Sequence, residues 1–190
     1  DLIGRRSNLK EKLPYVEAMV KYIDSVHWTC DNKEIKKKYR EDCKKFTKDL
    51  DSTRVLFWRT FYNDGVSQIN EVESLMEVVK EETDSTALAF YETRLEAMID
   101  SCKDNMMLAV AIDSTDGQPY IGLGSVYEKT KKFKESNEWF KRALGKTGDD
   151  NQVLLQIAYN YIQMNDYCEG IPYFREYVDN ATANEALMAD

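Results

Sequence analysis

Two consecutive stretches of 34 residues decide the fold: GQPYIGLGSVYEKTKKFKESNEWFKRALGKTGDD (residues 117–150) and NQVLLQIAYNYIQMNDYCEGIPYFREYVDNATAN (residues 151–184). Aligned without gaps, both show the same order of residue sizes: large, large, small and aromatic, then aromatic, small and aromatic. Steps of three and four residues between these positions predict two amphipathic helices in each stretch. The equivalent pairs are Tyr120 and Leu154, Leu123 and Ile157, Gly124 and Ala158, Tyr127 and Tyr161, Phe133 and Tyr167, Ser136 and Gly170, and Phe140 and Phe174.

The small residues of the pattern predict where the paired helices touch. Gly124 and Ala158 fall in the first helix of each pair, and Ser136 and Gly170 fall in the second. A larger side chain at these positions would hold the two helices apart. Pro119 suits the first turn of its helix, where a missing N–H costs nothing.

A period of 34 residues with this order of sizes resembles the tetratricopeptide repeat (TPR). The resemblance covers residues 117–150 and 151–184, and a weaker match suggests a divergent third repeat over residues 83–116. It implies an all-α fold in which helical hairpins stack into a solenoid. Residues 1–82 would then be an antiparallel helical segment that packs on or caps the solenoid, and residues 185–190 a tail.

Turn and capping residues divide the N-terminal part into several expected helices. Residues 33–48 carry one continuous apolar stripe and are predicted to form a single helix. Asp51 and Ser52 are typical N-caps and would open a new helix. Residues 63–65 (Asn-Asp-Gly) read as a turn, and Asp84 would cap another helix.

The four cysteines lie at positions 30, 43, 102 and 168, with no C-x-x-C spacing, and the chain has a single histidine. We therefore expect no metal site. If residues 33–48 form one helix, Cys30 and Cys43 are about 15 Å apart at 1.5 Å per residue, beyond the roughly 7 Å that a disulfide allows. Four free thiols slightly favour a cytoplasmic location. An exported or periplasmic protein whose signal segment has been removed is the alternative, because the chain begins at Asp1.

The charge balance argues against several classes of partner. The chain has 26 basic and 34 acidic residues, a net charge of −8, whereas nucleic-acid binding rests on a basic surface. No apolar run is long enough to span a membrane. One lysine-rich segment is either a solvated helix face or a patch for an acidic partner; it comprises Lys33, Lys36, Lys37, Lys38, Lys44, Lys45 and Lys48.

No constellation of residues predicts catalysis or a cofactor. The glycines at 122 and 124 lack the third glycine of a dinucleotide loop, since Tyr127 stands at that position. Neither His27 nor any cysteine has a partner for nucleophilic chemistry in the sequence pattern. We therefore expect a protein that is not an enzyme; an enzyme that uses a free thiol is the rival class.

The repeat pattern also predicts a binding surface. In TPR arrays the first helix of each pair lines a concave groove, and residues offset from the packing positions would face it. The family's best-known groove uses Lys and Asn to hold a terminal carboxylate, but this chain has apolar and aromatic residues instead, which suit an amphipathic helix or apolar peptide. The predicted groove residues are Gln118, Ile121, Ser125, Glu128, Gln152, Leu155, Tyr159 and Ile162.

These features predict a protein-interaction adaptor whose partner is a protein or peptide. One alternative is a structural homo-oligomer or a subunit of a larger assembly, such as one of the bacterial envelope, that uses the same groove for self-association. A second is that another helix of the same chain fills the groove.

Overall fold

The computed structural model describes residues 9–148 and 150–188 of the chain. Within these residues every regular element is an α-helix, which confirms the predicted all-α, TPR-like fold. The helices are α1 (Leu9–Asp31), α2 (Lys33–Lys38), α3 (Arg40–Glu81), α4 (Ser85–Ile112), α5 (Gln118–Lys129), α6 (Phe133–Ala143), α7 (Asn151–Gln163) and α8 (Tyr167–Met188).

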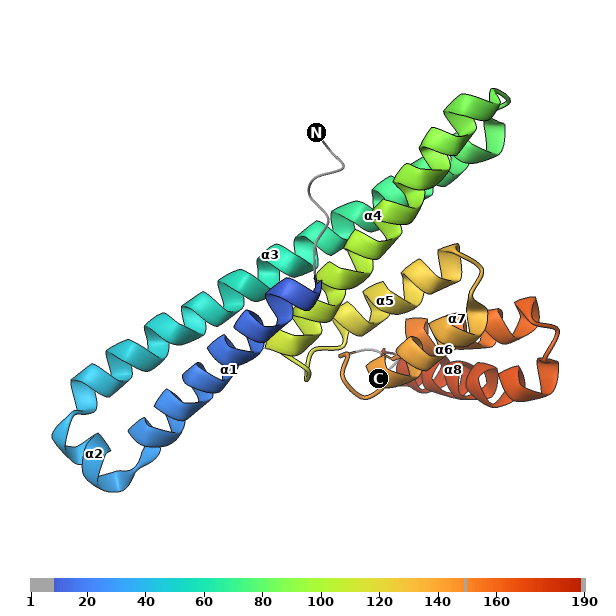
Figure 1. The fold of residues 1–190 in the computed structure, drawn as a ribbon. Coiled ribbons are helices and arrows are strands. Elements are labelled where there is room, and N and C mark those ends of the chain that lie inside the picture. Colours follow the sequence, from blue (N-terminus) through green and yellow to red (C-terminus); the bar gives the residue numbers. More distant parts are fainter. Residues whose placement is uncertain (1–8, 149, 189–190) are drawn as a thin grey trace.

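The molecule consists of a long helical hairpin with a compact helical stack on its side. Helices α3 and α4 run antiparallel, and α1 lies along the half of α3 that α4 leaves uncovered (Figure 1). Helices α5 to α8 form two successive hairpins, and α5 packs against α4. None of the helices within the described ranges is long and apolar enough to cross a membrane.

Helix α3 is continuous for 42 residues, so the predicted breaks at residues 51–52 and 63–65 are wrong. The hydroxyl of Ser52 donates to the carbonyl of Lys48 one turn earlier (2.8 Å), a bond that serves its polar group inside a helix. The carboxylate of Asp51 meets His27 of α1 at 2.8 Å and caps nothing. Tertiary contacts with α1 and α4 therefore hold α3 together where local signals predicted its end.

Gly65 marks a close helix contact and not the predicted turn. A Cβ at this position would lie 2.8 Å from Cε of Met106 on α4, and a Cβ at Gly122 of α5 would lie 2.6 Å from the same atom. Met106 is fully buried. The two glycines thus leave the space that this side chain fills where α3, α4 and α5 meet.

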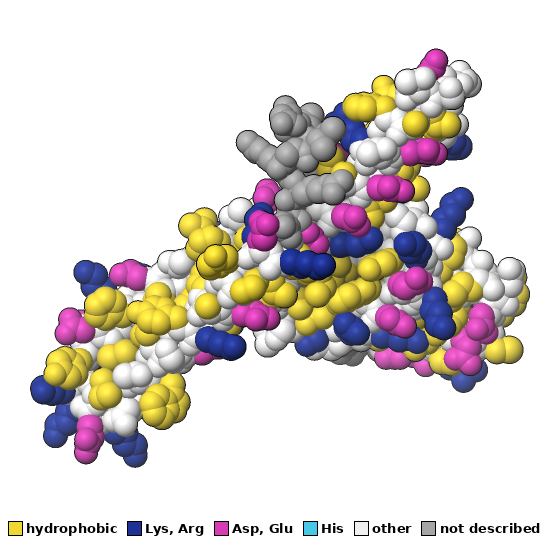
Figure 2. Space-filling view, viewed as in Figure 1, with side chains coloured by type: hydrophobic (Ala, Val, Ile, Leu, Met, Phe, Trp, Pro, Cys, Tyr) yellow, Lys and Arg dark blue, Asp and Glu magenta, His cyan; other side chains and the backbone are white. Residues whose placement is uncertain are grey.

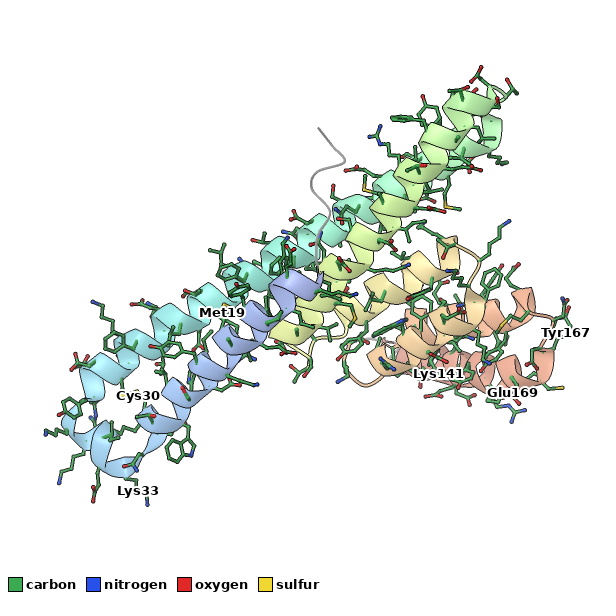
Figure 3. All side chains as sticks on the ribbon, in the orientation of Figure 1. Met19, Cys30, Lys33, Lys141, Tyr167 and Glu169 are labelled. Atoms are coloured by element: carbon green, nitrogen blue, oxygen red, sulfur yellow. A yellow bond between two sulfur atoms is a disulfide. The ribbon has the colours of Figure 1, made fainter. Side chains whose placement is uncertain are left out.

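Cys30 and Cys43 form a disulfide, contrary to the predicted free thiols. The expected helix over residues 33–48 breaks at Tyr39, whose backbone leaves the helical region (φ −124°, ψ 34°). This break turns α2 across the end of α1 and brings the two Cα atoms to 5.5 Å, within disulfide reach. Figure 3 shows Cys30 near the free end of the arm that α1, α2 and the first half of α3 form. Cys102 and Cys168 are free.

Residues 83–116 do not form the suggested hairpin of a third repeat. The predicted cap at Asp84 is confirmed, since its carboxylate accepts from the N–H groups of Thr86 and Ala87 at 2.9 Å. From there α4 runs without interruption to Ile112. The guanidinium of Arg54 on α3 donates to the Ile112 carbonyl (2.9 and 3.1 Å), which satisfies the last turn of α4.

The predicted contacts between small residues occur in both C-terminal hairpins. The Ser136 hydroxyl donates to the Gly124 carbonyl (2.8 Å). At the equivalent place in the second hairpin, a Cβ on Gly170 would lie 3.4 Å from the Ala158 carbonyl oxygen. Phe140 packs over Gly124 and is 1% exposed. The pattern of small residues thus sets how closely the helices of each hairpin approach.

Replacing Gly124 with alanine is expected to lower the melting temperature. The added Cβ would stand 2.5 Å from the Phe140 ring, and such overpacking costs about 1–3 kcal/mol, against at most about 1 kcal/mol that alanine contributes to a helix. Gly148→Ala is the control, because a Cβ there meets nothing within 4 Å. Equal melting temperatures for the two variants would show that α5 and α6 are not in close contact.

Candidate functional site

The α5 half of the predicted groove lies beside the chain's own α3. The hydroxyl of Tyr62 on α3 donates to Oε1 of Gln118 (3.4 Å), and Lys129 pairs with Glu73 of α3 (3.0 Å). Ile121 is half-buried and packs against the core between the two hairpins. Contacts within the molecule therefore cover part of this half, while Gln118 itself is exposed.

Ser125 and Glu128, the other two predicted residues of α5, are also half-buried. Burial raises the pKa of the Glu128 carboxyl, and the neighbouring Lys129 only partly opposes this effect. The Glu128 carboxyl makes the α5 half of the groove less suitable for an apolar peptide, because covering a carboxyl with apolar groups costs free energy.

The α7 half of the predicted groove is more accessible. Gln152 is exposed and Leu155 is half-buried. Tyr159 is 55% exposed and Ile162 is 45% exposed. Two large apolar side chains thus face solvent on the first helix of the last repeat, where the corresponding residues of α5 are Ser125 and Glu128.

Helix α8 carries a second exposed apolar stripe, and it includes Tyr167 and Phe174, which the repeat pattern had placed among the packing positions. Tyr167, Ile171, Phe174 and Val178 follow one another at steps of four, three and four residues and are all exposed. Figure 3 places Tyr167 at the outer end of the stack, where α8 begins. The 34-residue repeat could have predicted this stripe, because it aligns the stripe of α8 with the surface of α6 on which α7 packs.

The first hairpin shows what normally covers such a stripe. The α6 residues equivalent to Ile171, Phe174 and Val178 are Asn137, Phe140 and Leu144. Asn137 and Phe140 are buried, and Leu144 packs against the core cluster that includes Val153 and Ile157 of α7. Helix α8 has no such neighbour within the described residues. Together with the apolar residues of α7, the stripe forms what we call the end face: Leu155, Tyr159, Ile162, Ile171, Phe174 and Val178.

A buried polar network joins α7 to α6 but has no counterpart on the end face. The side-chain amide of Asn160 donates to the Ser136 hydroxyl (2.9 Å) and to Oδ1 of Asn137 (2.8 Å). At the positions equivalent to Ser136 and Asn137, α8 has Gly170 and Ile171. The end face is therefore more apolar than the surface that α7 covers.

Lys141 of α6 fixes α7 and α8 against the first hairpin. Its ammonium donates to the Tyr161 hydroxyl (2.8 Å) and lies over the rings of Tyr161 and Tyr173, 5.2 Å from each centroid. Burial disfavours the charge, but hydrogen bonds to the two hydroxyls outweigh burial and raise the pKa of Lys141. The helices that carry the end face are thus also linked to α6 through the exposed Lys141.

The described residues show no assembled catalytic or metal site. No group of three or more His, Cys, Asp or Glu side chains among them could hold a metal ion. Burial raises the pKa of the Cys102 thiol to about 12, and this thiol donates to the carbonyl of Gly65 (3.3 Å). At neutral pH Cys102 is therefore protonated and a poor nucleophile.

Comparison with known proteins identifies the first C-terminal hairpin. The family model described as tetratricopeptide repeat matches residues 117–145, which span α5 and α6. No curated protein and no solved structure matches the chain. The repeat points to protein–protein interaction and is generally non-catalytic.

Proposed function

Because the chain is a helical protein of the tetratricopeptide-repeat type, we propose that it is a non-enzymatic adaptor that binds an amphipathic helix of another protein. The helix docks on the end face, where α7 and α8 expose apolar side chains. This narrows the groove that the sequence predicted to its α7 half and extends it onto α8. Helix-in-groove binding reads apolar residues at steps of three and four along the partner.

The observation that carries this proposal is the contrast between two equivalent phenylalanines. Phe140 is 1% exposed beneath α7, whereas Phe174 is 50% exposed. In the first hairpin, Phe140 belongs to the buried cluster that holds Val153 and Ile157 of α7, and Ile121 packs against this cluster. Their equivalents Leu155 and Phe174 border the place where a further helix would lie, so the partner helix takes the position that α7 occupies one repeat earlier.

The composition of the end face defines the partner's chemistry. A helix like α7 that docked there would bury its Asn160 equivalent against Gly170 and Ile171, which offer no side-chain hydrogen bond. A buried unpaired amide costs about 1–3 kcal/mol. The preferred partner is therefore a helix that keeps the apolar residues of α7 and has an apolar residue in place of Asn160.

A matched pair of peptides tests this proposal. The first has the sequence of residues 150–163 of this chain, and the second carries Asn160→Leu within the same sequence. We expect the second peptide to bind the intact protein at least about fivefold more tightly, because the first peptide must bury the unpaired amide of Asn160 at a cost of about 1 kcal/mol or more. Fluorescence anisotropy of labelled peptides gives both affinities.

Two protein variants show where the peptide binds. Phe174→Glu places a charge in the end face and should abolish binding, whereas Tyr22→Glu alters an exposed aromatic residue on α1 and should leave binding unchanged. If neither peptide binds, or if both variants bind alike, the end-face proposal is wrong.

Self-association is the second candidate, and two observations favour it. The stripe of α8 exposes four large apolar side chains in a row, and such patches often mark interfaces. The Cys30–Cys43 disulfide is typical of the oxidising compartments in which exported assemblies form. In this case light scattering would show a mass that rises with protein concentration, and Phe174→Glu would remain a monomer. A constant monomer mass in the wild type leaves the adaptor as the function.

A further inference from the structure

The lysine-rich segment lies at the free end of the helical arm, opposite the repeats. Residues 28–48, which we call the tip, hold eight Lys and Arg side chains against four Asp and Glu. The other 169 residues hold 18 basic and 30 acidic side chains. The tip therefore has a net charge of +4 on a chain whose remainder has −12. Figure 2 shows Lys and Arg side chains gathered around this end, with hydrophobic side chains among them.

Large aromatic side chains are exposed among these charges. Trp28 is 78% exposed and Phe46 is 58% exposed. Tyr39 is 45% exposed and lies beneath the ammonium of Lys38, 5.0 Å from the ring centroid. The exposed rings of Trp28 and Phe46 place apolar surface in water. Removing this surface from water would be favourable.

Covalent and hydrogen-bonded contacts hold the helices of the tip together. The Cys30–Cys43 disulfide joins the end of α1 to the start of α3. Asn32 caps α2, since its side chain accepts from the N–H of Glu34 (3.0 Å). Further along the arm, His27 meets Asp51 (2.8 Å). Preorganisation of this kind lowers the entropy cost of binding.

The arm also separates the tip from the acidic remainder of the molecule. Helix α1 has 23 residues, which at 1.5 Å per residue makes it about 35 Å long. The Debye length at physiological ionic strength is about 8 Å. The negative charges of the repeats are therefore screened at the tip, which presents a positive end to its surroundings.

We propose that the tip binds the surface of an anionic lipid membrane, with Trp28 and Phe46 entering the headgroup region and the basic side chains facing the lipid phosphates. The negative surface potential of the membrane attracts lysine and arginine side chains. The four carboxylates of the tip weaken this attraction, but the net charge of +4 keeps it favourable. Tryptophan prefers the interface between headgroups and acyl chains. In the folded molecule this site lies at the free end of the arm, away from α7 and α8 (Figure 1), and it does not depend on the adaptor function.

A membrane suits the tip better than a nucleic acid does. Single-stranded nucleic acids bind in basic grooves in which aromatic rings stack on successive bases. The hollow that borders the tip has no aromatic side chain on which a base could stack; it is lined by Thr47, Lys48, Asp51, Ser52, Val55, Leu56 and Arg59. Trp28 and Phe46 are instead exposed to solvent outside it.

Vesicle sedimentation with the full chain tests this proposal. Vesicles of equal parts phosphatidylcholine and phosphatidylserine should bind the protein in a salt-dependent manner, and vesicles of phosphatidylcholine alone should not. Lys36→Gln/Lys37→Gln/Lys38→Gln should lower the partition coefficient about 100-fold, since each basic residue near an anionic surface contributes roughly fivefold. The control Lys131→Gln/Lys132→Gln/Lys134→Gln removes the same charge from exposed positions of the repeats and should bind like the wild type.

Tryptophan fluorescence tests the insertion itself. The emission should shift to the blue on anionic vesicles, and the shift should disappear in Trp28→Phe while sedimentation persists. Lack of binding to anionic vesicles, equal losses in the two lysine variants, or binding without a blue shift would each overturn the proposal. Binding to polyglutamate or to DNA but not to vesicles would assign the tip to an acidic macromolecule and overturn it as well.

Discussion

Phe140→Ala is expected to lower the free energy of unfolding by about 3–5 kcal/mol, the range for removing a buried phenylalanine side chain. Phe140 is fully enclosed between α5, α6 and α7: it packs over Gly124 and against the cluster that contains Val153 and Ile157. The cavity would open at the junction of the two hairpins, where little can move to fill it. Urea denaturation monitored by circular dichroism measures the change.

Phe174→Ala is the matched control for this prediction. The same residue type is replaced at the same position of the next repeat, but Phe174 is half exposed, so we expect a loss below about 1 kcal/mol. A similar loss in both variants would mean that Phe174 is covered in solution, either by a second copy or by another part of the chain. The pair of measurements therefore also tests whether the end face is free.

Cys30→Ser is expected to destabilise the arm by about 3 kcal/mol, the value for a disulfide that closes a loop of about 15 residues. The two cysteines are 13 positions apart, and the short α2 between them has no buried residue. Without the bond, α2 has little to hold it against the arm. We expect faster hydrogen exchange throughout α2 and an earlier unfolding of the arm in denaturant.

Cys168→Ser provides the comparison, because Cys168 is exposed and unpaired. It should leave both exchange and denaturation unchanged. If a reducing agent alters neither α2 nor the denaturation curve of the wild type, the disulfide does not stabilise the arm. Cys30→Ser, which loosens the tip, should also bind anionic vesicles less tightly than the wild type, because a preorganised tip loses less entropy on membrane contact.

The local sequence pattern predicted those contacts whose residues are close together in the sequence. The contact of Ser136 with Gly124 spans only 12 positions and follows from helix periodicity. The cap at Asp84 involves N–H groups two and three residues away. Such features are settled within one or two turns of helix, so a single sequence contains the information for them.

Contacts between distant segments could not be predicted in this way. The break at Tyr39 has no proline or glycine to signal it, yet it decides that Cys30 reaches Cys43. Gly65 resembles a turn residue in the sequence, but its role depends on Met106, which lies 41 positions later. For the candidate site, the sequence placed exposed apolar residues on α7 but missed the stripe on α8, because exposure depends on which helix is absent beside it.

By itself, the sequence determined that the chain is all-α and that its last two hairpins repeat with a period of 34 residues. Only the tertiary structure decided that α3 runs unbroken, that a disulfide closes the arm, and that α5 rests against α3 while α7 and α8 face solvent. The reason is physical: helix periodicity and capping are local, whereas burial, disulfide pairing and free surface depend on elements that meet only after the chain has folded.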